Sequence, residues 1–168
     1  MQGDRVDVIL AQWARERPDL DASPIGVVGR ISRAARRLDR ELEPVFRAHG
    51  LDASGFDVLV TLRRNGPPYL LSASAVADAT MVARSSTTSR VDRLEEAGLV
   101  ERVPDEDDGR GVGVRLTPAG LALIDGAMAA HVANEARLLA KLPPGAAERL
   151  ARALRSLLAG LEGPPPGG

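Results

Sequence analysis

The chain has 168 residues, of which 44% are hydrophobic and 27% are charged, and its formal net charge is −1. These values are typical of one folded globular domain and give no sign of disorder before the C-terminal tip. The chain has no cysteine and only two histidines, which excludes disulfides, thiolate metal sites and a histidine-rich metal centre. The composition does not exclude metal sites made of carboxylates, but we predict neither a metal site nor a cofactor.

The N-terminal segment and the apolar runs bear on where the protein works. Residues 1–12 carry three charged side chains and have no hydrophobic run long enough for a secretory signal. No segment approaches the roughly 20 apolar residues of a membrane span. We therefore expect a cytoplasmic protein with no membrane association. The near-neutral charge counts mildly against nucleic-acid binding, although the placement of charge matters more than its total.

Apolar spacing predicts two helices in the first 50 residues. Residues 1–18 form the first, with a helical repeat made by Val6, Ile9, Leu10 and Trp13. The second covers residues 24–50, with Ser23 as the capping residue and Pro24 at the first helical position. Because proline removes a backbone hydrogen bond, Pro44 is expected to bend or break this helix near residue 43.

Three shorter helices are predicted next. Asp52 caps the first, which ends at the Asn-Gly-Pro-Pro sequence of residues 65–68. Ser72 caps the second, which ends near Thr80. The third covers residues 84–97 and begins with a run of hydroxyl side chains.

A β-hairpin and two long helices complete the prediction. Valines at 100 and 103 and the alternating residues 112–116 predict two strands, joined by the polar turn 104–111. Apolar repeats then predict helices over 118–140 and 145–161, and the Pro/Gly-rich segment 162–168 is predicted to be a disordered tail.

A short helix, a Ser/Thr-rich helix and a hairpin with a charged tip, in this order, indicate a winged helix-turn-helix. The fold class predicted is therefore mainly α with a small β-hairpin. Hydroxyl groups and arginines suit phosphates and base edges, and an arginine on a hairpin tip can enter a narrow minor groove. The candidate DNA-binding residues are Ser72, Arg84, Ser85, Ser86, Thr87, Thr88, Arg90, Arg93, Asp108 and Arg110. Capping, solubility and a solvated turn are the competing explanations.

The sequence resembles the MarR-type transcriptional regulators. The matching parts are Leu51 to Leu62, Ser85 to Leu99, and Asp108-x-Arg110 followed by Val114-x-Leu116-Thr117-x-x-Gly120. The resemblance implies a homodimer on a pseudo-palindromic operator, usually as a repressor. It divides the chain into an extra N-terminal helix (1–18), a helical dimerisation region (24–50 and 118–161) and a winged helix-turn-helix lobe (51–116).

Within that family the chain is similar to the urate-responsive branch, which has an extra N-terminal helix carrying a tryptophan. The resemblance implies a ligand site for urate or a related anionic purine, made of Trp13, Asp57, Arg90 and Arg102. An aromatic plane and guanidinium donors suit such a ligand. Each residue also has a simpler explanation: Trp13 could dock the first helix, Asp57 could pair with an arginine, and Arg90 could contact DNA alone. The pair Ala83-Arg84 departs from the branch, and this could alter operator preference.

Other classes of protein fit the sequence less well. No nucleophile elbow, metalloprotease motif or P-loop is present, so we predict that the chain is not an enzyme. A helical dimeric interaction protein that keeps the winged fold without binding DNA is one alternative. A MarR-type regulator that responds to a different small aromatic or carboxylate ligand is another.

Overall fold

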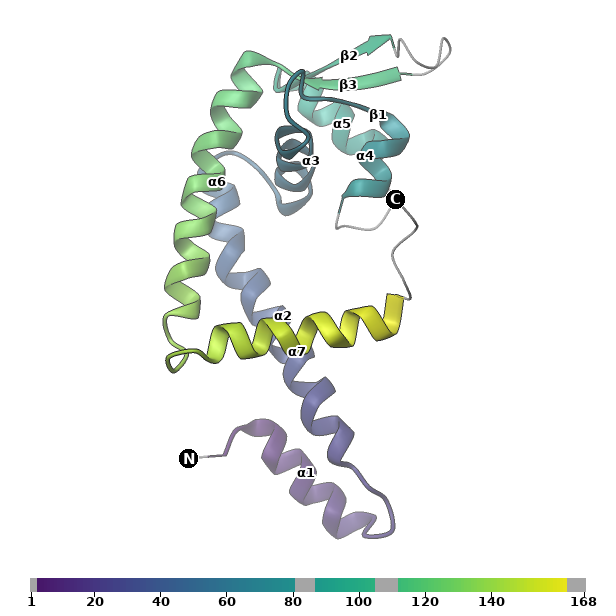
Figure 1. The fold of residues 1–168 in the computed structure, drawn as a ribbon, viewed down its shortest axis with the longest axis vertical. Coiled ribbons are helices and arrows are strands. Elements are labelled where there is room, and N and C mark those ends of the chain that lie inside the picture. Colours follow the sequence, from purple (N-terminus) through teal and green to yellow (C-terminus); the bar gives the residue numbers. More distant parts are fainter. Residues whose placement is uncertain (1–2, 81–86, 105–111, 163–168) are drawn as a thin grey trace.

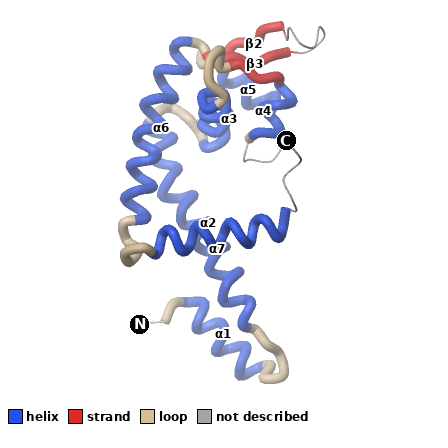
Figure 2. Tube along the Cα trace, in the orientation of Figure 1, coloured by secondary structure: helices blue, strands red, loops and turns tan. Residues whose placement is uncertain are grey.

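The computed structural model describes residues 3–80, 87–104 and 112–162. The fold is mainly helical, with one small antiparallel sheet (Figures 1 and 2). Helices α3, α4 and α5 and the sheet form a lobe at one end, and α1 lies at the other end. The long helices α2 and α6 leave the lobe side by side, and α7 crosses α2 between the lobe and α1 (Figure 1).

Helix α1 spans Arg5–Glu16 and begins with a capping box at Asp4. Helix α2 spans Ser23–Ala48 and its N-cap residue is Ala22, so the predicted cap at Ser23 is wrong by one residue. Ser23 lies inside the first turn, and the carboxylate of Asp21 accepts hydrogen bonds from the Ser23 amide at 2.9 Å and from its hydroxyl at 3.1 Å. The acidic side chain of Asp21, which precedes the helix, therefore accepts the hydrogen bond at the helix start that the serine hydroxyl was expected to accept.

Helix α2 continues through Pro44, and the predicted break is wrong. Only one turn follows the proline, and that turn carries Phe46, which is buried in the core. The Phe46 ring contacts Phe56 and His131, with centroids 4.7 and 5.5 Å away. The Phe46 carbonyl also accepts the amides of His49 and Leu51 at 3.0 Å. This tertiary packing offsets the backbone hydrogen bond that proline removes.

The lobe is built on α3 (Ala53–Arg64), whose Val58, Leu59 and Leu62 are fully buried. The predicted caps are confirmed, since Asp52 accepts the Gly55 amide at 2.6 Å and Ser72 accepts the Ala75 amide at 3.1 Å. Helix α4 covers Ala73–Ala79, with Thr80 as its C-cap residue, so it ends near Thr80 as predicted. Helix α5 covers Thr87–Glu96. The predicted start of α5, residues 84–86, lies outside the described residues.

The sheet contains the predicted hairpin and one strand more. Strands β2 (Val100–Pro104) and β3 (Val112–Leu116) pair antiparallel, as predicted, while the tip between them lies outside the described residues. A third strand, β1 (Leu70–Ser72), pairs with β3 and gives the order β1-β3-β2. The sequence analysis missed β1 because three residues are too short to show an alternating pattern.

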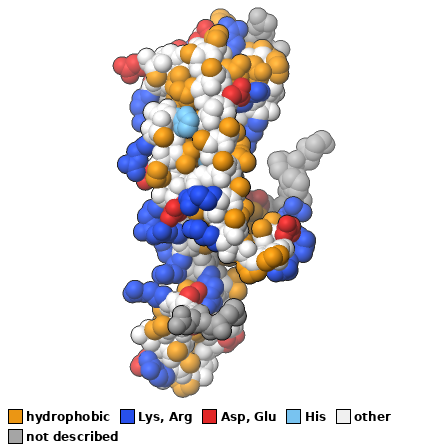
Figure 3. Space-filling model, turned by 90° about the vertical axis from the view of Figure 1, so that its left-hand side faces the viewer, with side chains coloured by type: hydrophobic (Ala, Val, Ile, Leu, Met, Phe, Trp, Pro, Cys, Tyr) orange, Lys and Arg blue, Asp and Glu red, His pale blue; other side chains and the backbone are white. Residues whose placement is uncertain are grey.

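The C-terminal helices leave much apolar surface uncovered. Helix α6 (Pro118–Leu139) begins at the predicted Thr117 cap, and α7 (Ala146–Glu162) has no buried residue along its length. Figure 3 shows apolar side chains exposed on the α6 face of the molecule. Large exposed apolar residues on these helices, on α2 and on the turn between α6 and α7 are Val27, Val28, Leu38, Val132, Leu139, Leu142, Leu150, Leu157, Leu158 and Leu161. None of the described helices is long and apolar enough to cross a membrane.

Candidate nucleic-acid interface and effector site

Helix α5 has one buried and one polar face. Val91 and Leu94 are 2% and 5% exposed and fasten the helix to the lobe core. Thr88, Ser89 and Arg93 are exposed. The helix therefore rests on the lobe by its apolar side and presents hydroxyl and guanidinium groups to solvent, as a recognition helix must.

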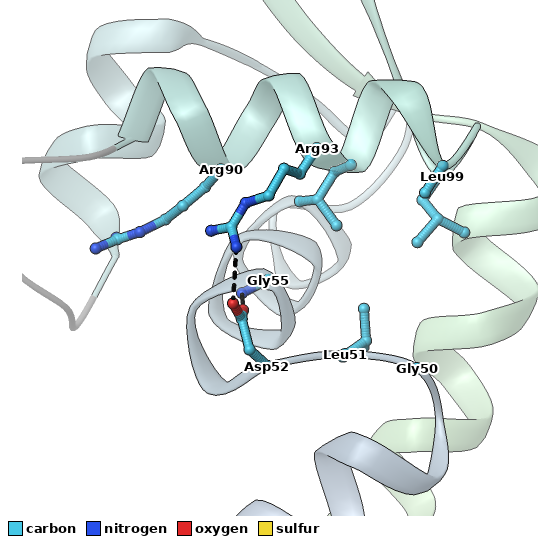
Figure 4. Close-up of a pocket in the computed structure, with 9 residues that line it drawn as sticks. Gly50, Leu51, Asp52, Gly55, Arg90, Arg93 and Leu99 are labelled. Carbon is cyan, nitrogen blue, oxygen red and sulfur yellow. Dashed lines mark hydrogen bonds and ion pairs between the residues drawn. The ribbon is translucent and has the colours of Figure 1, made fainter.

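Arg93 is held at the edge of this exposed face. Its guanidinium lies 3.3 Å from the Asp52 carboxylate (Figure 4). It also donates to the Ser89 carbonyl. Partial burial would raise the pKa of Asp52, but hydrogen bonds from Gly55 and Ser54 and the nearby arginines outweigh it and lower the pKa. Asp52 thus stays ionised, caps α3 and fixes the start of α3 against α5.

Arg90 differs from Arg93 because its side chain is buried, with 7% exposure. It projects from α5 on the side that faces the start of α3 (Figure 4). There it lines a cavity of about 150 Å³ together with Gly50, Leu51, Asp52, Gly55, Arg93, Leu94, Ala97 and Leu99. In this arrangement Arg90 is not displayed for contact with a base. The cavity is also smaller than the roughly 300–1,000 Å³ of typical small-molecule sites.

Arg102 connects the wing, which is the hairpin of β2 and β3, to α5. It lies on β2, and its guanidinium bonds to the carboxylates of Asp92 and Glu95. Its backbone amide also donates to Glu95 at 3.0 Å. The hydrogen bond to Asp92, and less so Glu95, raises the pKa of Arg102. The sequence analysis missed these two acidic partners, although their spacing of three on one helix face was visible.

The described chain does not bring the four predicted ligand residues together. Successive residues turn by about 100° around a helix, so the Asp92 and Glu95 that hold Arg102 lie on the opposite side of α5 from Arg90. Asp57 is buried on α3, with 8% exposure. Trp13 is 41% exposed on α1, at the far end of the molecule from the lobe (Figure 1).

The remaining candidate DNA contacts divide into two groups. Ser72 lies at the junction of β1 and α4, where its hydroxyl caps α4 and lies 3.0 Å from Ser74. Arg84, Ser85, Ser86, Asp108 and Arg110 lie outside the described residues. Thr87 is the first residue of α5. Within the described part of the chain, no group of three or more potential ligands could hold a metal ion.

A short α4, an α5 with a polar outer face and a hairpin packed beside it define a winged helix-turn-helix DNA-binding protein. The sequence profile of the MarR family matches residues 49–111. The chain is 47% identical over 134 residues to the HTH-type transcriptional regulator PecS of Dickeya dadantii, covering 80% of this chain and 81% of that protein. This protein belongs to the MarR family of DNA-binding transcriptional regulators.

Solved structures agree with this assignment. The MarR-family regulator Sco3205 of Streptomyces coelicolor, solved in complex with DNA, superposes with a TM-score of 0.74 at 26% identity, covering 84% of this chain and 89% of that one. BpsR of Bordetella bronchiseptica, whose DNA binding is regulated by 6-hydroxynicotinic acid, superposes with a TM-score of 0.67 at 27% identity. That match covers 83% of this chain and 94% of BpsR. These relatives are transcription regulators and not enzymes.

Proposed function

We propose that this MarR-family protein is a homodimeric, cytoplasmic repressor that leaves a pseudo-palindromic operator when a small anionic ligand, urate or a related purine, binds. One observation carries the ligand part of the proposal: two charged side chains, Asp57 and Arg90, are buried inside the lobe beside α5. Burying charge is costly, so buried ionisable groups beneath a recognition helix are candidates for a functional role.

The dimer supports operator recognition. Large apolar side chains are left exposed on α2, α6 and α7, and exposed apolar surface of this kind marks a protein–protein interaction site. We assign residues 24–50 and 118–161 to dimerisation and 51–116 to the DNA-binding lobe. Two lobes related by a two-fold axis would read half-sites about one helical turn of DNA apart, roughly 10 base pairs.

The proposed DNA contacts come from α5 and the wing. Thr88 and Arg93 are exposed on α5 and are proposed to contact DNA. The other proposed contacts are the residues that precede them, Arg84, Ser85, Ser86 and Thr87, and the wing pair Asp108 and Arg110. Because Arg102 bonds to two carboxylates of α5, a movement of α5 would carry the wing with it. Both parts of the DNA-binding surface would then shift together.

The effector is proposed to act through Arg90. A planar anion that draws the Arg90 guanidinium toward itself would change how α5 sits on α3. Two recognition helices must match two successive grooves, so a small shift in each lobe weakens the fit. By thermodynamic linkage, DNA weakens ligand binding by the same factor by which the ligand weakens DNA binding. A factor of 10 to 100 corresponds to a coupling free energy of about 1.4–2.8 kcal/mol. One charge-assisted pair gained in one state can supply this.

The direct test is a titration of the protein–DNA complex with urate. A fluorescent duplex from the region upstream of the protein's own gene is bound at low salt, and its anisotropy is followed as urate is added. We expect release of the duplex. Trp13→Phe should bind the duplex as the wild type does and need about fivefold more urate for release, since one stacking contact is worth about 1 kcal/mol.

Each part of the proposal fails separately in this test. If the duplex is not retained, repression through this operator is wrong. If saturating urate neither releases the duplex nor raises the melting temperature, the purine assignment is wrong while DNA binding stands. A parallel titration with a pyridine carboxylate tests the second candidate ligand class, which the regulation of BpsR by 6-hydroxynicotinic acid favours.

A further inference from the structure

Positive charge is concentrated on α2, outside the winged helix-turn-helix lobe. Residues 51–116, which form the lobe, carry eight arginines and eleven acidic side chains and so have a formal net charge of −3. Helix α2 carries six arginines and three acidic side chains and so has a net charge of +3. Attraction between basic side chains and phosphates supplies essentially all of the sequence-independent affinity for DNA. The lobe as a whole repels phosphates, and positive charge elsewhere in the chain would offset that repulsion.

Four arginines of α2 form a stripe along one side of the helix. Because successive helical residues turn by about 100° and rise by about 1.5 Å, these four fall within a sector of about 60° and extend over about 21 Å. All four side chains are exposed. We call them the arginine stripe: Arg33, Arg36, Arg40 and Arg47.

The arginine stripe faces solvent and not the lobe core. Leu42 and Phe46 mark the core side of α2, and they lie more than about 100° around the helix from the centre of the stripe. Figure 3 shows basic side chains gathered halfway along the molecule, between the lobe and α1. A hollow of about 570 Å³ between side chains of α2 is lined by Arg33, Arg36, Arg37, Asp39 and Arg40.

Most of the arginine stripe has no acidic partner. Arg47 lies 3.2 Å from Glu43. Within residues 3–80, 87–104 and 112–162, no ion pair or hydrogen bond engages the guanidinium of Arg33, Arg36 or Arg40. Like charges three or four residues apart destabilise a helix. The stripe therefore costs stability in the free protein, and an anionic partner would offset this cost.

The length of the arginine stripe indicates which anion fits it. Arg33 and Arg47 are separated by about 21 Å along the helix axis, so one small anion cannot contact both. Each strand of duplex DNA carries one phosphate per 3.4 Å of axis, so 21 Å corresponds to about six phosphates of one strand. Since the chain belongs to a family of DNA-binding regulators, duplex DNA is an extended polyanion that the protein meets.

The arginine stripe also begins near the recognition helix. Arg47 is the last residue but one of α2, and Asp52, five residues later, lies 3.3 Å from the Arg93 guanidinium of α5. The end of α2 therefore lies beside the edge of the exposed α5 face. DNA that rests on α5 and continues along α2 would meet Arg47 first and Arg33 last.

We infer that the arginine stripe of α2 contacts the phosphate backbone of bound DNA, as a second contact surface besides α5 and the wing. Phosphate contacts fix the position of a protein on the duplex but read no base sequence. The stripe therefore contributes equally to binding of operator and non-operator DNA. This inference rests on DNA binding by the family and not on the proposed effector.

The salt dependence of DNA binding tests the arginine stripe. The triple variant Arg33→Gln, Arg36→Gln, Arg40→Gln removes three guanidiniums and keeps good helix formers in α2. Its binding to the fluorescent upstream duplex, and to a scrambled duplex of equal length, is followed by anisotropy from about 50 to about 200 mM salt. Each lost phosphate contact lowers the slope of log affinity against log salt by about 0.9, so the slope should become less steep by about two to three. At the lowest salt both duplexes should bind at least about tenfold more weakly.

The matched control removes three exposed arginines from α7: Arg149→Gln, Arg152→Gln and Arg155→Gln. It loses the same charge and should keep the wild-type slope to within about one unit. The inference is overturned if the slope of the stripe variant changes by less than two. It is also overturned if the control changes as much, or if only operator binding weakens.

Thermal melting separates lost contacts from lost structure. The stripe variant should melt at the wild-type temperature or above it, because repulsion within α2 is relieved. If it melts lower, Arg36→Gln alone replaces it and should lower the slope by about 0.9. An unchanged slope in that single variant overturns the inference.

Other occupants of the arginine stripe would give different results. If sodium tripolyphosphate raises the melting temperature of the wild type but not of the stripe variant, and both bind DNA equally, the stripe binds a small polyanion and the DNA contact is wrong. If the stripe variant sediments as a monomer where the wild type is a dimer, the stripe is a protein contact and the inference is again wrong.

The stripe and the proposed effector fail in distinguishable ways. Urate that does not release DNA contradicts the effector and leaves the stripe standing. A wild-type slope in the stripe variant contradicts the stripe and leaves the effector standing. Wild-type protein that retains neither duplex at low salt contradicts both.

Discussion

Gly120 stands in the first turn of α6, where the backbone of another segment leaves no room for a side chain. A Cβ atom at this position would lie 1.9 Å from the Leu99 carbonyl oxygen. The same carbonyl accepts the Thr117 amide at 3.1 Å, and the Thr117 hydroxyl bonds to Gly98 at 2.7 Å. The turn between α5 and β2 is thus locked against the start of α6.

Gly120→Ala should therefore destabilise the fold, by about 3 kcal/mol, because the obstructing atom belongs to backbone that cannot rotate away. Gly126→Ala in the same helix is the matched control. A Cβ there meets nothing within 4 Å, and alanine should gain roughly 0.5–1 kcal/mol over glycine in a helix. Urea unfolding followed by circular dichroism measures both. Equal midpoints for the two variants would show that the close approach at Leu99 is wrong.

Among the elements, α1 is held to α2 by ion pairs as well as by apolar contact. Arg30 of α2 is its main polar anchor, and the hydrogen bond from Arg30 holds the pKa of Asp7 below its ordinary value. Hydrogen bonds to Asp7 and Asp4 in turn raise the pKa of Arg30. These groups are exposed, so the anchor orients α1 more than it stabilises the whole fold.

The anchor should weaken in acid. Because the pKa of Asp7 is lower in the folded than in the unfolded chain, its contribution is fully present above the unfolded value, about 3.9. It is lost as the pH falls through the lowered folded value. Emission and anisotropy of Trp13, the one tryptophan, should stay constant from neutral pH down to about pH 5 and change below about pH 4. Arg30→Gln should show the loosened signal already at neutral pH; an unchanged signal in that variant would contradict the anchor.

At the same scale, α5 and the wing behave as one unit. The predicted recognition helix and hairpin are joined by the ion pairs that Arg102 of β2 forms with Asp92 and Glu95 of α5. Arg102 was predicted as a ligand residue, and the structure gives it another set of partners. The two assignments are compatible only if the ligand competes with Asp92 and Glu95 for the guanidinium.

For the whole molecule, the decisive feature is an amphipathic α7 with its apolar face uncovered. Leu157 and Leu161 are 42% and 73% exposed. A dimer that buries them explains why the chain keeps a leucine face at a surface position.

Leu157→Asp and Leu161→Asp should each weaken dimerisation by at least about tenfold, which is 1.4 kcal/mol, because a charge is placed in an apolar interface. Helical content should be retained, since α7 buries nothing in its own subunit. Ser156→Asp, on the same helix and exposed, is the control. Sedimentation equilibrium at micromolar concentrations measures all three. If the leucine variants associate as the wild type does, α7 is not part of the interface.

The sequence by itself determined most local structure. Capping residues at Asp52, Ser72 and Thr117 and the apolar repeats placed the helices, because a cap and a helical face involve residues close together in the chain. The alternating residues of the hairpin placed β2 and β3 for the same reason. Together with the family resemblance, these features were sufficient to predict a winged helix-turn-helix.

Only the tertiary structure decided the features that depend on distant partners. Strand β1 exists because β3 offers it a free edge, and α2 passes Pro44 because the core holds Phe46. Whether an arginine of α5 faces solvent or the interior depends on how that helix docks, which is why Arg93 is exposed and Arg90 is buried. The separation of Trp13 from Asp57 and Arg90 follows from the length and packing of α2, because contacts between remote segments are set by the whole fold and leave no local pattern in the sequence.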